Sequence, residues 1–287
     1  MDGWSGALIV EWVIPGLLLI AMIAVLVVRK RLPKTTSLTL CEYWVYLPEP
    51  KLPKIEEIMD SMISSNPHNR PGKPCIGARE GMLFSDIRLH MAIARRGKNP
   101  HIFRPDLFHP ACTPSQETLG RLSRAQAIAK VRYLSEVPLA DTRHLQFMPH
   151  LADTISRLAN GLAVFDPVLD ELTTAEEFRQ RISDSPNQER IDKHSRVVWL
   201  PDELGGVVET RGLRKIGIPE LKTKCIPNDE RSVVEPVIEE ALGRFWREPR
   251  ELPYSFEFER LGQWFKVQID LGTLIEAPVT VSRRLAP

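Results

Sequence analysis

Five residues whose side chains can bind metals or move protons lie close together between positions 90 and 112. A structural zinc site places two ligands about two to four residues apart in each half. Only one pair of the five has that spacing, which favours exposed or helix-capping histidines over a metal site. Should a metal bind here, the candidate ligands are His90, His101, His109 and Cys112, with Asp106 as the fifth residue of the group.

A catalytic cysteine needs a neighbouring histidine and surroundings that stabilise the thiolate. His109 and Cys112 form the one local pair of this kind, so they are the candidate catalytic residues. The sequence lacks the G-x-S-x-G elbow, both glycine-rich phosphate-binding motifs and H-E-x-x-H. We therefore expect no cofactor, and we keep a membrane-bound hydrolase or transferase, with its site around residues 90–112, as an alternative function.

A second charged group lies in residues 211–217, which read RGLRKIG. Arg211, Arg214 and Lys215 are candidate anion-binding residues, because guanidinium and ammonium groups hold phosphates and carboxylates. That interpretation makes the chain a sensor of a small ligand. A solvated turn before a strand at Glu220 is the alternative, and the sequence favours it.

A third segment, from Phe103 to Phe108, has bulky apolar residues around the charge pair of Arg104 and Asp106. Such a loop docks either on the core of its own domain or on a partner. The sequence does not decide between these two possibilities.

Hydrophobic periodicity predicts the elements that position these residues: alternation predicts strands and recurrence every three to four residues predicts helices. Tight turns between several strands imply antiparallel neighbours. The predicted class is α+β, with a mixed, mostly antiparallel sheet and packed amphipathic helices. Strands are predicted at 37–47, 87–94, 101–104, 162–165, 196–200, 206–210, 220–226, 256–258 and 265–271, with an edge strand at 279–282; helices are predicted at about 54–64, 113–135, 151–158, 174–182 and 233–247.

A run of about 17 uncharged residues from Trp12 to Val28 predicts one transmembrane helix, which at 1.5 Å per residue covers roughly 25 Å. A buried core helix would need a polar face, and a cleaved signal peptide would carry its basic residues before the apolar run. Here the basic residues follow it, at 29–34, so the positive-inside rule places the C-terminal side in the cytoplasm.

These features predict the domain organisation. Residues 1–11 form a short tail outside the cell, 12–28 span the lipid, 29–36 form a basic linker and 37–287 form a cytosolic α+β domain. A polar stretch near 183–195 is a possible boundary within that domain. The predicted location is the bacterial inner membrane, with a single pass.

Composition and net charge limit the kinds of partner that the chain can bind. The 287 residues are 43% hydrophobic and 26% charged, with a formal net charge of +1. No global electrostatic field therefore favours nucleic acid, which we exclude as a partner. The four cysteines, Cys41, Cys75, Cys112 and Cys225, form no C-x-x-C pair and are expected to be free thiols, mostly buried.

The anchor and the lack of a catalytic motif favour a protein that binds another protein over an enzyme. The expected role is an accessory or assembly subunit of a membrane complex, or an immunity-type protein. Its partners are membrane lipid, through residues 12–28, and a protein that the sequence does not identify.

Overall fold

The computed structural model describes residues 39–64, 86–183, 190–248, 252–260 and 262–284. Contacts within the chain divide it into two units, Met1–Thr36 and Ser37–Pro287, and all described residues belong to the second. The predicted tail, membrane span and linker at residues 1–36 lie outside the described residues, as does Cys75. Among the described residues, no helix has the length and apolar character to cross a membrane.

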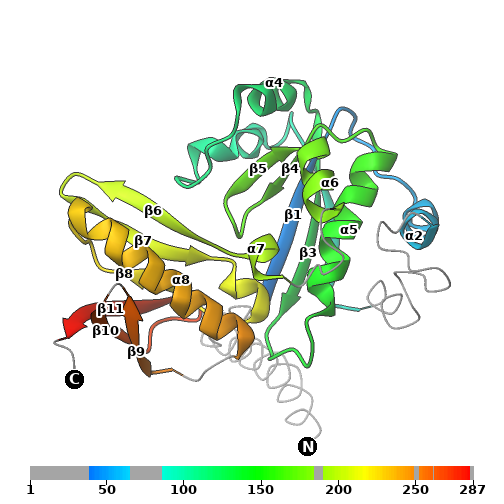
Figure 1. The fold of residues 1–287 in the computed structure, drawn as a ribbon. Helices are drawn as coiled ribbons and strands as arrows, with labels where there is room; N and C mark the ends of the chain where they lie inside the picture. The colour runs from blue at the N-terminus through cyan, green and yellow to red at the C-terminus, as the bar shows by residue number, and fades with distance from the viewer. Residues whose placement is uncertain (1–38, 65–85, 184–189, 249–251, 261, 285–287) are drawn as a thin grey trace, which may run out of the picture. The chain divides into compact units, whose positions relative to one another are not determined.

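The first half of this unit is built around a five-stranded antiparallel sheet with the strand order β2-β3-β1-β4-β5. The main elements follow one another along the chain as strand, helix, two strands, helix and strand, and in the sheet β1 is the central strand. This is the split βαβ arrangement, extended at one edge by β5 (Figure 1). The elements are β1 (Thr39–Leu47), α2 (Ile55–Ser64), β2 (Leu89–Arg95), β3 (Ala127–Ser135), α5 (Arg143–Leu158), β4 (Ala163–Asp166), β5 (Glu171–Thr174) and α6 (Ala175–Ser183).

Strand β1 is apolar on both faces, and both faces are covered, as the sequence predicts. Cys41, Tyr43 and Val45 pack in one core cluster with side chains of α2, α5 and α6. On the other face, Tyr46 packs with Phe103 and Leu122, which belong to the segment between β2 and β3. The central strand therefore joins two separate cores.

The segment between β2 and β3 differs from the prediction. It contains the 3-10 helices η2 (Pro100–Phe103) and η3 (Pro105–Leu107) and the helix α4 (Gln116–Arg124), so the strand predicted at 101–104 is wrong. The helix predicted to run to Ser135 ends at Arg124. The residues that follow form β3, because they pair with β1 on one side and β2 on the other.

The capping box predicted at Thr174 is confirmed. The Glu177 amide donates to Thr174 Oγ1 (3.2 Å), and the Thr174 amide donates to Glu177 Oε2 (2.8 Å). This reciprocal pair satisfies backbone donors at the start of α6. It also fixes the point at which β5 ends.

The second half of the unit forms a six-stranded sheet with the order β6-β7-β8-β11-β10-β9. Helix α8 packs on this sheet through buried apolar side chains, among them Val237, Ala241 and Phe245 (Figure 1). The elements are α7 (Ile191–His194), β6 (Arg196–Asp202), β7 (Gly205–Arg211), η4 (Leu213–Ile216), β8 (Glu220–Thr223), η5 (Asn228–Glu230), α8 (Arg231–Arg247), β9 (Tyr254–Arg260), β10 (Gln263–Ile269) and β11 (Glu276–Arg284).

Both predicted hairpins of this half, β6–β7 and β9–β10, are confirmed. Strand β11 is not the edge strand that the sequence predicts, since it lies between β10 and β8 and pairs with β8 in parallel. The described residues thus form an α+β fold with one antiparallel and one mixed sheet. The predicted boundary near 183–195 falls in the sequence between the strands of the two sheets, and both sheets belong to the same compact unit.

Candidate functional site

The turn between β4 and β5, residues 166–170, lies where the two sheets meet and carries a buried carboxylate at each end. Asp166 and Asp170 are each 1% exposed. Asp166 Oδ1 accepts hydrogen bonds from the amides of Val168 and Leu169, both 3.1 Å, which holds the turn in shape. Asp170 has a left-handed backbone, with φ at 54°. The turn therefore presents two fixed negative charges to the second sheet.

Lys215 of η4 meets the first of these carboxylates. Its side chain is 0% exposed, and its Nζ donates to Asp166 Oδ2 at 2.5 Å and to the Tyr43 hydroxyl at 3.4 Å. Burial raises the pKa of Tyr43, and it raises the pKa of the nearby Cys41 thiol to about 12. The ammonium–carboxylate pair therefore has a neutral phenol and a neutral thiol beside it, and it joins η4 to the first sheet.

Asp170 contacts three cationic or protonatable side chains. His109 Nδ1 lies 2.7 Å from its Oδ1, and Arg211 Nη2 lies 3.3 Å from its Oδ2. Arg196 donates to its backbone carbonyl at 3.0 Å. Arg211 also pairs with Glu209 at 2.5 Å. A network of charges thus runs from the loop after η3, through the turn, to β7.

Of the predicted catalytic pair, His109 is oriented by the Asp170 carboxylate, which the sequence analysis did not identify. Its ring also contacts the edge of Phe165, with centroids 5.0 Å apart. Cys112 is buried, and burial raises the pKa of its thiol to about 12. Because that thiol is protonated at neutral pH, Cys112 lacks the thiolate that a nucleophile needs.

The other predicted metal ligands and Asp106 lie apart from this network. His90 is exposed on β2 opposite Arg132, His101 is exposed in η2, and Asp106 pairs with Arg104. No hydrogen bond or ion pair in the described part of the chain joins the side chains of any two of the five residues proposed between 90 and 112. In the same part, no group of three or more His, Cys, Asp or Glu residues could hold a metal ion.

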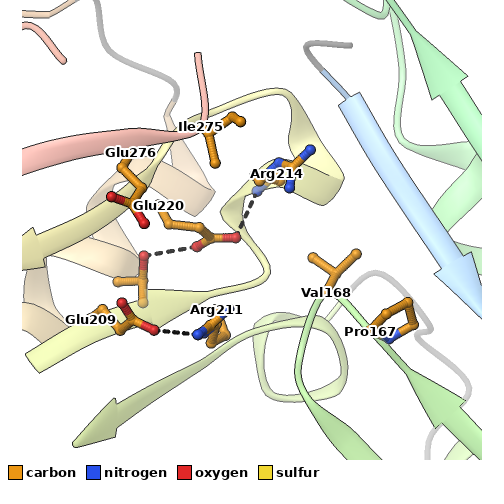
Figure 2. A pocket seen from close by; sticks show the side chains of 9 residues that line it. Pro167, Val168, Glu209, Arg211, Arg214, Glu220, Ile275 and Glu276 are labelled. Atoms are coloured by element: carbon orange, nitrogen blue, oxygen red, sulfur yellow. Dashed lines mark hydrogen bonds and ion pairs between the residues drawn. The ribbon is translucent and has the colours of Figure 1, made fainter. Parts of the chain in front are cut away.

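A pocket of about 60 Å³ opens beside the turn, between the two sheets (Figure 2). That volume holds several water molecules or one carboxylate group. The turn supplies two of the lining residues, and β7, η4, β8, β11 and the loop before β11 supply the others. They are Pro167, Val168, Glu209, Thr210, Arg211, Arg214, Glu220, Ile275 and Glu276.

Glu220 forms the floor of this pocket and fixes η4. Its carboxylate accepts hydrogen bonds from the Thr210 hydroxyl (2.9 Å) and from the amides of Gly212 (2.8 Å), Leu213 (3.2 Å) and Arg214 (3.3 Å), two of which Figure 2 shows. Burial raises the pKa of Glu220 to about 7 against the opposing effect of these donors. Gly212 has φ at 111°, and a Cβ there would lie 2.0 Å from the His194 carbonyl.

The three cations predicted to bind an anion have separate roles. Lys215 is paired with Asp166 and buried, so the solvated-turn interpretation is wrong for this residue. Arg211 is paired with Asp170 and Glu209. Arg214 has no hydrogen bond or ion pair of its guanidinium among the described residues, and its partly buried side chain lines the pocket.

No family model matches the chain, and no curated protein or solved structure is significantly similar to it.

Proposed function

We propose that the chain is a single-pass membrane-anchored protein whose cytosolic domain, residues 37–287, binds a protein partner. The role is that of an accessory or assembly subunit of a membrane complex, or of an immunity-type protein. The uncharged run at 12–28 supplies the anchor, and the basic residues at 29–34 keep the domain on the cytoplasmic side.

The observation that carries the partner-binding proposal is a loop, residues 100–112, which we name the apex loop. Two adjacent large apolar side chains in it, Leu107 and Phe108, are each 64% exposed. Adjacent exposed apolar side chains on an ordered loop are typical of interaction sites. The loop lies at the Leu47 end of β1, because the Tyr46 hydroxyl donates to the Ile102 carbonyl at 3.1 Å.

The apex loop is held in place by its first half. Phe103 is 1% exposed and packs edge-on against Tyr46, with centroids 5.9 Å apart. The Arg96 guanidinium lies over the Phe103 ring at 4.6 Å, and Arg104 donates to Asp106 at 2.9 Å. Part of this segment therefore docks on the core of its own domain, while Leu107 is presented outward without needing to be ordered on binding.

The alternative, a membrane-bound hydrolase or transferase, rests on the pair of His109 and Asp170. A buried carboxylate on one ring nitrogen orients a histidine for acid–base chemistry at the other. The protonated thiol of Cys112 leaves that histidine without the nucleophile that the sequence predicts beside it. Partner binding is therefore the function that the described residues favour.

The anchor is tested with the full-length chain carrying a C-terminal tag. We expect the chain to sediment with membranes, to resist extraction by high salt and to be released by mild detergent. We also expect an impermeant reagent to label the tag only after the cells are permeabilised. Recovery of the chain in the aqueous fraction without detergent, or labelling of the tag on intact cells, would contradict the anchor or its orientation.

Partner binding is tested by replacing both Leu107 and Phe108 with aspartate in the full-length chain. We expect co-purification of one partner from mild-detergent extracts to fall about tenfold or more, because the apolar contact is replaced by charge. The fold should be unchanged, since both side chains are exposed. Quantitative mass spectrometry of the co-purified proteins measures the loss.

The matched control is Leu204→Asp, which changes a leucine that is 90% exposed at the β6–β7 turn. This variant should retain the partner at the wild-type level. If the double apex-loop variant also retains it, or if the wild-type chain enriches no protein over a detergent control, the proposed role of the apex loop is wrong.

A further inference from the structure

Residues 86–124, which run from just before β2 to the end of α4, carry more positive charge than their own acidic residues compensate. The segment contains seven arginine and lysine residues and three acidic residues. Each acid is paired with an arginine of the same segment: Asp86 with Arg88 (3.5 Å), Asp106 with Arg104 (2.6 Å) and Glu117 with Arg121 (2.8 Å). Four cations of the segment therefore remain without an acidic partner in it.

One of these four, Arg96, joins the turn after β2 to the end of α4. Its guanidinium donates to the carbonyls of Ala125 (2.6 Å) and Leu122 (2.5 Å) in the last turn and cap of that helix. Its backbone amide donates to the Gln126 carbonyl at 2.9 Å. The positive charge of Arg96 thus binds helix carbonyls, which carry the negative end of the helix dipole.

The other three cations, which we name the basic rim, lie on the two segments that Arg96 joins. Arg95 is the last residue of β2, Lys98 lies in the turn that follows, and Arg124 is the last residue of α4. All three side chains are exposed, and none of them forms an ion pair with any of the described residues. Because the formal net charge of the whole chain is only +1, this positive charge is a local feature.

The basic rim borders the apex loop. The Arg96 guanidinium lies 4.6 Å from the centroid of the Phe103 ring, which belongs to that loop. Leu107 comes four residues later, so its Cα lies at most about 14 Å from the Cα of Phe103. An interface of standard size covers about 800 Å² on each partner, which is a patch roughly 30 Å across. One partner can therefore contact the basic rim and the exposed pair of Leu107 and Phe108 together.

We infer that the protein bound by the apex loop presents acidic side chains to the basic rim, around an apolar group that packs on Leu107 and Phe108. This inference rests on the partner binding proposed above and adds the chemistry of the partner's surface. Exposed charges beside an apolar contact are the arrangement of a protein interface, where complementary charge at the rim accelerates association and excludes wrong partners. A nucleic acid would need a longer positive surface, whereas the cations next to the rim are already bonded within the chain.

The test is selection of random dodecapeptides, displayed on phage, against the full-length chain held in detergent micelles by a C-terminal tag. Peptides selected on the wild-type chain should be enriched in Asp or Glu close to Leu, Ile, Phe or Trp. A charge-reversal variant carrying Arg95→Glu, Lys98→Glu and Arg124→Glu should instead select Lys and Arg, because the preferred charge follows the sign of the rim. The best wild-type peptide should bind this variant about tenfold more weakly, and a rise in NaCl from about 50 to about 500 mM should reduce that difference.

Matched variants separate the basic rim from other exposed charges and from the apolar contact. The control for charge reversal carries Lys224→Glu, Arg260→Glu and Arg283→Glu, which change three exposed cations in the second half of the chain. It should select the same acidic peptides as the wild-type chain. Leu107→Ser combined with Phe108→Ser should lose the apolar preference and keep the acidic one, since the rim is intact.

An absence of acidic enrichment on the wild-type chain, or the same enrichment on the charge-reversal variant, would overturn the inference. Displacement of the best peptide by equimolar oligouridine would also overturn it, by assigning the rim to nucleic acid. Displacement by phosphatidylserine but not by phosphatidylcholine, added to the micelles, would overturn it by assigning the rim to lipid. If the aspartate variant of the apex loop loses its co-purified partner while the charge-reversal variant selects as the wild type does, the proposed function stands and this inference fails.

Discussion

Replacement of Lys215 by methionine is expected to lower the free energy of unfolding of the domain by about 3–5 kcal/mol. The methionine fills a similar volume, but Asp166 is then left as an unpaired charge that is 1% exposed. A buried carboxylate without a counter-ion is among the most destabilising defects that a substitution can produce. Urea unfolding of the full-length chain in mild detergent, followed by tryptophan fluorescence, measures the loss.

Two further variants show whether the charge or the packing is responsible. Lys215→Met combined with Asp166→Asn should recover most of the stability, since no buried charge remains and the asparagine Oδ1 can still accept from the Val168 and Leu169 amides. Lys222→Met, which removes a lysine whose side chain is 37% exposed, should cost less than about 1 kcal/mol. A Lys215→Met protein as stable as the Lys222→Met protein would show that the pair between the sheets contributes nothing.

The Lys215 pair also shows why the sequence did not reveal the site. Three cations and two glycines within seven residues indicate a solvated turn or an anion site, and both interpretations treat the segment as exposed. Its counter-ions Asp166 and Asp170 lie more than forty positions upstream, in the motif FDPVLD, where no local pattern marks them. Only the packing of η4 against β1 brings the two segments together.

Local patterns predicted the elements that local interactions stabilise. The hairpins β6–β7 and β9–β10 have alternating apolar residues on both sides of a tight turn, so their pairing is encoded within about fifteen residues. Strand β3 is different, because Leu119, Leu122, Ala125 and Ala129 have a helical spacing that continues into it. Its conformation is determined by pairing with β1, whose residues lie about ninety positions earlier in the sequence. Glu42 of β1, for example, lies opposite Arg132 and forms an ion pair with it.

The interior position of β11 has the same explanation. Its sequence gives a short alternating run, which is compatible with an edge or a centre position. The parallel partner β8 lies more than fifty residues upstream, with Glu276 opposite Glu220 in the register. That pairing also brings the Leu271–Ile275 loop beside Glu220, so the topology that sequence periodicity missed is the one that builds the pocket.

A second large effect is expected from pH, through His144 in the first turn of α5. Its Nε2 donates to the Lys215 carbonyl at 2.7 Å, and its ring stacks on Tyr133, with centroids 5.1 Å apart. Burial lowers the pKa of this imidazole from 6.5 to about 4. Between pH 4 and pH 6.5, this histidine is protonated in the unfolded chain and neutral in the folded chain. The free energy of unfolding is therefore unaffected by His144 above pH 6.5 and decreases as the pH falls toward 4, by about 3 kcal/mol in total.

Glu220 acts in the opposite direction over an overlapping range, and this decides how the measurement must be made. Its pKa is raised to about 7, so the folded chain retains a proton that the unfolded chain loses above pH 4.5, and this contribution falls as the pH rises. The wild-type profile alone mixes the two effects. The difference in unfolding free energy between the wild-type and His144→Gln chains isolates the histidine, because Glu220 is common to both and the glutamine amide can still donate to the Lys215 carbonyl. That difference should decrease by about 3 kcal/mol from pH 7 to pH 4; a difference that is constant across this range would show that His144 has the same pKa in the folded and unfolded chains.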